Sequence, residues 1–137
     1  REAELALGHA RIVSNQIKYS LFDHEFADEI LPYCRDNGIT ILAYSSLEQG
    51  AFQDRITERA ELGSTLDAIS NEIGKTRAQI ILNWVLREPN VVTIPMTNRI
   101  ERIHENCGAA GWRLSDGQHE AITKAAGPSS TRRWWTN

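Results

Sequence analysis

Three short stretches of the chain carry the apolar and β-branched residues that are typical of strands. Residues 11–19 alternate between apolar and polar side chains, which is the pattern of a strand with one buried face. Residues 39–44 are almost continuously apolar, and such runs suit strands that are buried on both faces of a parallel sheet. A third and shorter run, residues 91–94, ends at Pro95.

The segments around these strands show the start and stop signals of helices. Polar residues suited to N-caps precede the apolar positions, and Gly or Pro follows them. The predicted helices begin with a helix tail over 2–7 ended by Gly8, and a helix over 24–36 that is capped by Asp23, kinked or restarted at Pro32 and stopped by Gly38. Two further helices are predicted over 65–73, with Ser64 and Asp67 as capping box and Gly74 as stop, and over 77–87, with Thr76 and Gln79 as capping box. The last two are predicted over 99–110, capped by Asn98 with Glu101, and over 116–126, capped by Ser115 with Gln118. Residues 45–63 are polar, contain two glycines and predict a long loop.

Strands that alternate with helices predict right-handed parallel βαβ units, and hence an α/β fold with three parallel strands and flanking helices. So small a sheet leaves two strand edges and one face without a cover. We expect apolar strand residues to be exposed on that face. They are either Ile17, Ile41, Ala43, Val92 and Ile94, or the alternate residues of the same strands.

Composition narrows the class of protein. The 137 residues are 41% hydrophobic and 24% charged, which is typical of one globular domain. A net charge of −3 gives no electrostatic footprint for nucleic acid, and no apolar run approaches the roughly 20 residues of a membrane span. We therefore expect no nucleic-acid or membrane partner. The four histidines have no ligand-like spacing, so no metal site is predicted.

The sulfur-containing residues add two expectations. Cys34 and Cys107 are too few for a disulfide scaffold, and reduced thiols in a cytoplasmic protein are favoured over a single disulfide. The chain begins at Arg1, and its only methionine is Met96. We therefore expect that it is not a whole primary translation product.

Five blocks of sequence, in this order, resemble the C-terminal part of the aldo-keto reductase family. The resemblance covers roughly residues 2–126. The blocks are VSNQIKY (13–19), LPYCRDNGI (31–39), LAYSSLEQG (42–50), AQIILNWVL (78–86) and IPMTNRIERIHEN (94–106). A chance match of all five blocks in register is improbable.

The resemblance implies a fold and an activity for the complete family member. The family is a (β/α)8 barrel that reduces carbonyl groups with NADP or NAD, and this chain would supply a partial, half-barrel-like piece with the last three of eight strands. The family's catalytic aspartate, tyrosine, lysine and histidine have no matching position here, so we expect no catalytic residue and no turnover by this chain alone. By motif, Tyr44 matches the tyrosine that stacks on the nicotinamide ring.

The resemblance also assigns cofactor contacts at the ends of the first two strands. Asn15 and Gln16 match the Asn-Gln pair whose glutamine contacts the nicotinamide carboxamide, for which an amide offers both a donor and an acceptor. Tyr44 ends a buried strand, where barrel active sites are built. Ser45 and Leu47 match the loop beside the pyrophosphate. The alternative for Gln16 is a polar side chain at a strand end in contact with water, and for Tyr44 it is a boundary tyrosine with its hydroxyl in solvent.

A second group of matched residues follows the third strand. Thr97, Arg102, Glu105 and Asn106 match the pocket for the adenosine and its 2′-phosphate. The family usually has lysine where this chain has Met96, and loss of that cation puts a preference for the phosphorylated cofactor in doubt. An ion pair between Arg102 and Glu105, three residues apart on a helix surface, is the alternative interpretation.

Three interpretations of the whole chain remain. It is a fragment of a carbonyl reductase, or a non-catalytic binding or assembly module, or a half-barrel that pairs with a second copy or with a separate N-terminal barrel part. We expect residues 1–128 to form the half-barrel-like domain and residues 129–137, with Trp134 and Trp135, to form a tail. Because a closed barrel has no edges, a dimer is the favoured assembly.

Overall fold

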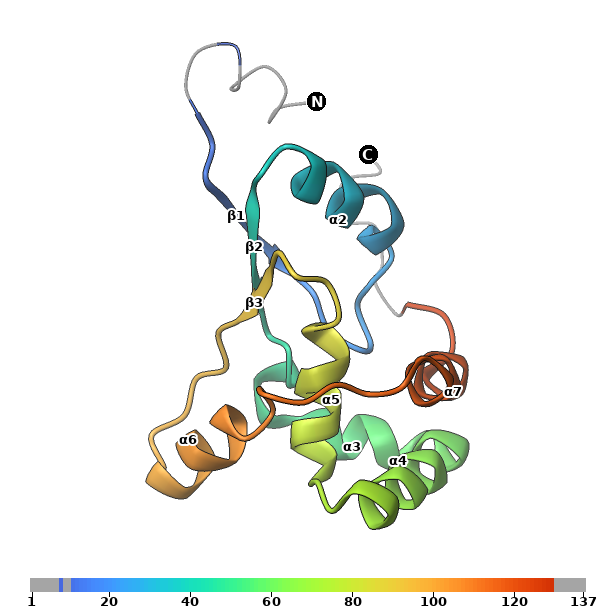
Figure 1. The fold of residues 1–137 in the computed structure, drawn as a ribbon. Helices are drawn as coiled ribbons and strands as arrows, with labels where there is room; N and C mark the ends of the chain where they lie inside the picture. The colour runs from blue at the N-terminus through green and yellow to red at the C-terminus, as the bar shows by residue number, and fades with distance from the viewer. Residues whose placement is uncertain (1–7, 9–10, 130–137) are drawn as a thin grey trace.

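The computed structural model describes Gly8 and residues 11–129. Strands and helices alternate along the chain as predicted, with further helices inserted after the second strand (Figure 1). The elements are β1 (Ser14–Lys18), α2 (Ala27–Asp36), β2 (Thr40–Tyr44), the short 3-10 helix η1 (Glu48–Gly50), α3 (Phe52–Thr57), α4 (Ala60–Ile73), α5 (Arg77–Val85), β3 (Val91–Thr93), α6 (Ile100–Cys107) and α7 (Asp116–Ala126).

The three strands form one parallel sheet in the order β1-β2-β3. In β1, Gln16 pairs with Leu42 of β2, and Lys18 pairs with Tyr44. Leu42 pairs in turn with Val92 of β3. The sheet does not close, so β1 and β3 are both edge strands among the described residues. The predicted fold class, a partial barrel of three parallel strands with flanking helices, is confirmed.

The two faces of the sheet differ in burial. Ile41 and Ala43 are fully buried beneath the helices, because alternate residues of a strand point to opposite faces. On the other face, which we call the open face, Tyr44 is 39% exposed and Val92 is 46% exposed. The register also places Gln16, Lys18 and Leu42 on it. The exposed set therefore mixes the two expected alternatives, since Val92 and Ile94 are exposed but Ile41 and Ala43 are not.

Helix α5 lies at the centre of the helical layer, between α4, α6 and α7 (Figure 1). Six consecutive residues of α5, 80–85, are buried, so the helix has no solvent-facing side over that length. The apolar residues that form the core around it include Leu62, Leu66 and Ile69 of α4, Ile80, Ile81 and Val85 of α5, and Ile122 of α7.

The loop predicted over residues 45–63 was wrong, because this segment contains η1, α3 and the start of α4. Phe52 and Ile56, four residues apart, are both buried and hold α3 against the core. Helix α4 begins at Ala60, so Ser64 lies within the helix and its hydroxyl donates to the Glu61 carbonyl. Asp67, the other half of the predicted capping box, pairs with Arg77 instead.

Two of the predicted N-caps are confirmed, and Asp23 and Asn98, like Ser64, do not cap a helix. Thr76 with Gln79 and Ser115 with Gln118 both form reciprocal capping boxes. Asp23 does not cap α2, which begins four residues later, and it pairs with Lys18 instead. Asn98 does not cap α6, since the backbone N–H of Arg99 bonds to the Thr97 hydroxyl.

Other expectations about the helices have mixed outcomes. Helix α2 runs through Pro32 as one helix, so no new helix starts there. Gly38 and Gly74 both follow helices with φ near +66°, the left-handed conformation expected at a helix end. Residues 2–7 and the Trp134-Trp135 tail lie outside the described residues. Within residues 11–129, no helix has the length and hydropathy of a membrane span, and no group of three metal-ligating side chains gathers.

Trp84 of α5 is the centre of an aromatic cluster that joins α5 to α7. Its ring stacks on His119, with ring centroids 5.2 Å apart and planes 3° apart, and its indole N–H donates to the Thr123 hydroxyl. The Nε2 atom of His119 is buried and has no hydrogen-bond partner. Burial, and then the positive charge of Arg87, hold the pKa of His119 below its usual value.

This burial predicts a pH dependence of stability. The fold favours neutral His119, so the unfolded chain binds a proton that the native chain resists as the pH falls below about 6.5. The free energy of unfolding should therefore decrease between pH 7 and 5, with a contribution from this residue of at most about 1.4 kcal/mol per pH unit. His119→Phe, which keeps the ring stack, should flatten the slope in urea titrations, whereas His104→Phe on the exposed face of α6 should not. Equal slopes in both variants would contradict the assignment.

Candidate functional site

The candidate site lies where β1 and β2 end and where the chain turns away from the sheet. Carboxyl ends of parallel strands meet at one edge of a sheet, and in barrels this edge carries the functional loops. Here the edge is formed by Lys18 and Tyr44, which pair in register, and the backbone N–H of Tyr19 continues the pairing to the Tyr44 carbonyl at 3.4 Å.

The open face presents a row of side chains at this edge. Gln16 is exposed and lies one strand away from Leu42, and Tyr44 lies two residues further along β2 on the same face. An exposed amide and an exposed aromatic ring on one face suit the contacts that the sequence assigns to Gln16 and Tyr44. Asn15 pairs with Ile41, whose side chain lies beneath the helices. The structure therefore does not bring Asn15 to the open face.

The segment after Tyr44 makes a tight loop with an unusual backbone. Ser45, Glu48 and Gln49 have φ angles of 55°, 49° and 55°, which L-residues adopt at a cost of about 1–2 kcal/mol each. Within the loop, the N–H of Glu48 bonds to the Ser45 carbonyl and the N–H of Gly50 bonds to the Leu47 carbonyl, each at 2.8 Å. Leu47 packs against the core, and Ser45 is half-buried.

A set of charged and polar side chains lies beneath this loop. The hydroxyl of buried Ser20 donates to Glu48 Oε1 at 2.5 Å. Lys18 Nζ lies 2.8 Å from Asp23 Oδ2 and 4.0 Å from Glu48 Oε2, and Arg55 approaches the same Glu48 oxygen at 3.9 Å. The hydrogen bond to Asp23 is the main cause that raises the pKa of Lys18, so the ammonium form is stabilised.

Sequence reasoning did not find this set. Asp23 was interpreted as a helix cap, and Ser20 and Glu48 were given no role. Ser20 directly follows the first strand, and a hydroxyl that is buried there needs a hydrogen-bond partner. Its position in the sequence is therefore the signal that could have indicated such a contact. The identity of the partner is not visible locally, since Ser20 and Glu48 are 28 residues apart in the chain.

The second group of predicted residues lies on α6 and the turn before it, beyond the end of β3 (Figure 1). The hydroxyl of Thr97 accepts the N–H of Arg99. Arg102 Nη1 forms an ion pair with Glu105 Oε2 at 3.2 Å, which is the alternative that the sequence left open. The guanidinium is still about half exposed, and Asn106 is half-buried. Met96 is 98% exposed.

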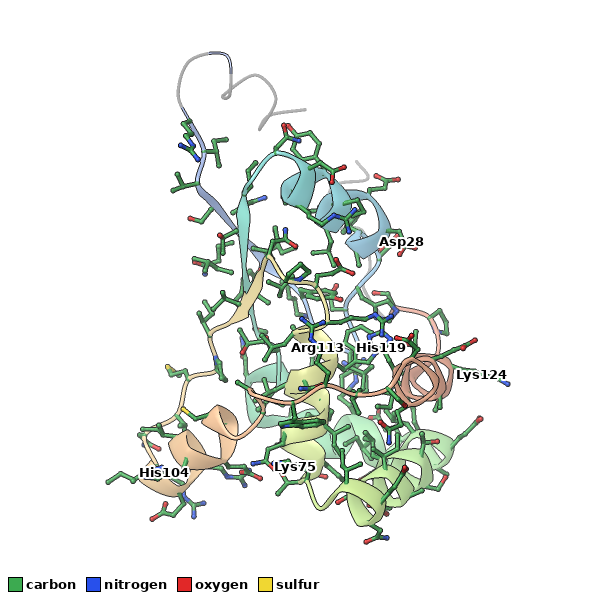
Figure 2. All side chains as sticks on the ribbon, viewed as in Figure 1. Asp28, Lys75, His104, Arg113, His119 and Lys124 are labelled. Atoms are coloured by element: carbon green, nitrogen blue, oxygen red, sulfur yellow. The ribbon has the colours of Figure 1, made fainter. Side chains whose placement is uncertain are left out.

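A cavity among the described residues belongs to neither group. It measures about 440 Å³ and lies between the end of α5 and the segment that leads into α7. Figure 2 shows Arg113 and His119 together at this place. The guanidinium of Arg113 donates to the Arg87 carbonyl, and Arg87 pairs with Asp116 at 3.0 Å. The positive groups of this cavity are thus already engaged in local contacts.

Comparisons with known proteins agree with this geometry. A model of the aldo/keto reductase family matches residues 2–126. An uncharacterized oxidoreductase of Mycobacterium tuberculosis is 31% identical over 100% of this chain and 50% of that protein. The NAD(P)H-dependent pentose reductase of Pyricularia oryzae is 31% identical over 69% of this chain and 30% of that protein. The chain thus spans about half, or less, of the length of these relatives.

Solved structures give the same result. The thermostable aldo-keto reductase Tm1743, bound to the inhibitor epalrestat, superimposes with a TM-score of 0.77 at 31% identity, over 90% of this chain and 43% of that one. An aldo-keto reductase from Klebsiella pneumoniae, in complex with NADP and acetate, gives a TM-score of 0.74 at 28% identity, over 88% and 41%. With a parallel β1-β2-β3 sheet, an open face and a family match along nearly its whole length, the chain belongs to the aldo-keto reductase family and forms a C-terminal part of its barrel.

Proposed function

We propose that the chain is the cofactor-binding C-terminal half of an NAD(P)H-dependent carbonyl reductase. The observation that carries this proposal is the joint exposure of Gln16 and Tyr44 on one face, at the carboxyl ends of adjacent parallel strands. These side chains fit a nicotinamide, because an amide pairs with a carboxamide and an aromatic ring stacks on a planar ring. Related structures with bound NADP support the choice of cofactor.

In this proposal the two halves of the barrel have different roles, because this chain matches only one of them. It matches about half of the length of its relatives. The family resemblance assigns the catalytic aspartate, tyrosine, lysine and histidine to the half that this chain does not match. In this proposal the proton donor for carbonyl reduction belongs to the other half of the barrel. Ser45 and Leu47 would line the pyrophosphate, and Thr97, Arg102, Glu105 and Asn106 would hold the adenosine end. Free Cys34 and Cys107 fit a reducing compartment such as the cytoplasm.

The open face and the two strand edges favour a partner. Exposed apolar side chains continue from the sheet into α6, namely Val92, Ile94, Met96, Ile100 and Ile103. A contiguous apolar surface of this kind is typical of an interaction site. In the proposal an N-terminal barrel part, or a second copy of the chain when that part is absent, covers the β3 part of this surface, Val92 and Ile94, and leaves Gln16, Tyr44 and α6 accessible to the cofactor. The same observation supports the second candidate function, a non-catalytic assembly module.

Substitution of Tyr44 tests the cofactor proposal. Tyr44→Ala removes the ring that would stack on the nicotinamide, and such ring pairs contribute about 0.5–1.5 kcal/mol. We expect the Kd for NADPH, measured by calorimetric titration of the chain, to rise about two- to tenfold. Tyr44→Phe keeps the ring and should bind like the unmodified chain. Unchanged binding in Tyr44→Ala would contradict the proposed site.

Substitution of Met96 tests the preference between cofactors. The family resemblance puts a lysine at this exposed position, and Met96 cannot pair with a 2′-phosphate. Met96→Lys should lower the Kd for NADPH about two- to fivefold, as expected for an exposed ion pair, and should leave the Kd for NADH unchanged. Met96→Gln is the neutral control. Equal effects of Met96→Lys on both cofactors would show that the phosphate is bound elsewhere.

A further inference from the structure

The backbone of residues 45–50 needs a contact from outside the loop to keep its shape. Ser45, Glu48 and Gln49 all have positive φ, and none of them is glycine. Residues in such conformations persist only where surrounding structure determines them. The loop's own backbone bonds, from Glu48 to Ser45, Gly50 to Leu47 and Ala51 to Glu48, join neighbours in sequence and do not attach the loop to the sheet.

Leu47 packs against the core, and the hydroxyl of buried Ser46 donates to the Ala43 carbonyl. The charged contact comes from Glu48, whose side chain turns inward and is only 10% exposed. Its Oε1 atom accepts the hydroxyl of Ser20, a residue with no exposed surface. Ser20 is itself fixed, because its backbone exchanges hydrogen bonds with Asp23 at 3.0 and 3.2 Å and its Oγ accepts the N–H of Phe22. The Ser20–Glu48 bond therefore attaches the loop after β2 to the turn after β1.

The charges around this bond are balanced. Lys18 lies between the carboxylates of Asp23 and Glu48, and Arg55 approaches Glu48 from α3. Two cations and two carboxylates leave no formal net charge, so a buried carboxylate is tolerated here. The balance also means that Glu48 does not place an uncompensated negative charge beneath a loop that is proposed to line a diphosphate.

We propose that the Ser20–Glu48 hydrogen bond, flanked by Lys18 and Arg55, is a clamp that positions the loop of residues 45–50 for the diphosphate of the nicotinamide cofactor. This inference rests on the proposed function, since Ser45 and Leu47 are the loop residues expected beside the diphosphate. Glu48 is a positioning residue, because its carboxylate is engaged by Ser20, Lys18 and Arg55 and it acts through the backbone of that loop.

The test compares Glu48→Ala and Glu48→Gln with the unmodified chain and with Glu120→Ala, a control at an exposed glutamate of α7. Hydrogen exchange of the Gly50 and Ala51 amides is measured without cofactor, and the Kd for NADPH is measured separately. Loss of a hydrogen bond to a charged group should speed exchange in Glu48→Ala about tenfold and raise the Kd about tenfold. Glu48→Gln keeps an acceptor for Ser20 and should lie between Glu48→Ala and the unmodified chain.

The two measurements separate the clamp from the proposed function. If the unmodified chain binds no NADPH, the proposed function fails, and the exchange rates still decide whether Glu48 holds the loop. Unchanged exchange in Glu48→Ala would overturn the clamp. Faster exchange in Glu48→Ala with an unchanged Kd for NADPH would overturn the role of the clamp in cofactor binding. If Glu48→Gln is as impaired as Glu48→Ala, the ion pairs of Glu48, and not its hydrogen bond to Ser20, hold the loop.

Discussion

The whole structure depends on a sheet that is covered by helices on one face only. Ile41 and Ala43 are fully buried on that face, and α5 lies buried among its neighbouring helices. Among residues 11–129, the buried apolar core therefore lies on this side of the sheet. The other face, with Tyr44 and Val92, is left for contacts with groups outside the described residues.

Because only one face of the sheet is covered, the candidate site has residues on one side only. The strand ends supply Gln16 and Tyr44, and the turn and helix after β3 supply Thr97 and Arg102, but both groups lie on one side of the space that a cofactor would fill. In our proposal the Ser20–Glu48 clamp gives the loop of residues 45–50 a fixed shape before any ligand arrives. A loop that is already in its bound conformation loses less entropy on binding, which favours affinity.

Structural features whose partners lie close in sequence could be predicted, and features that depend on a residue far away in the sequence could not. The boxes of Thr76 with Gln79 and Ser115 with Gln118 were predictable because both partners lie within one helical turn. Asp23 has the same cap chemistry, but Lys18 binds it more closely than any helix end does. The helices within residues 45–63 were missed because only two apolar residues, Phe52 and Ile56, mark α3. The burial of Ile41 and Ala43 and the pairing of Ser20 with Glu48 depend on strand register and tertiary contact, which hydrophobic periodicity does not encode.

The open face is the central claim, and the mass of the chain in solution tests it most directly. In the part of the chain that the structure describes, one apolar face is uncovered and β1 and β3 are edge strands, which favours association. Light scattering at micromolar concentration should therefore give about twice 15.4 kDa. Val92→Lys, which places a charge on the β3 side of the open face, should shift the population toward the monomer. A single species of 15.4 kDa across the whole concentration range would contradict the account.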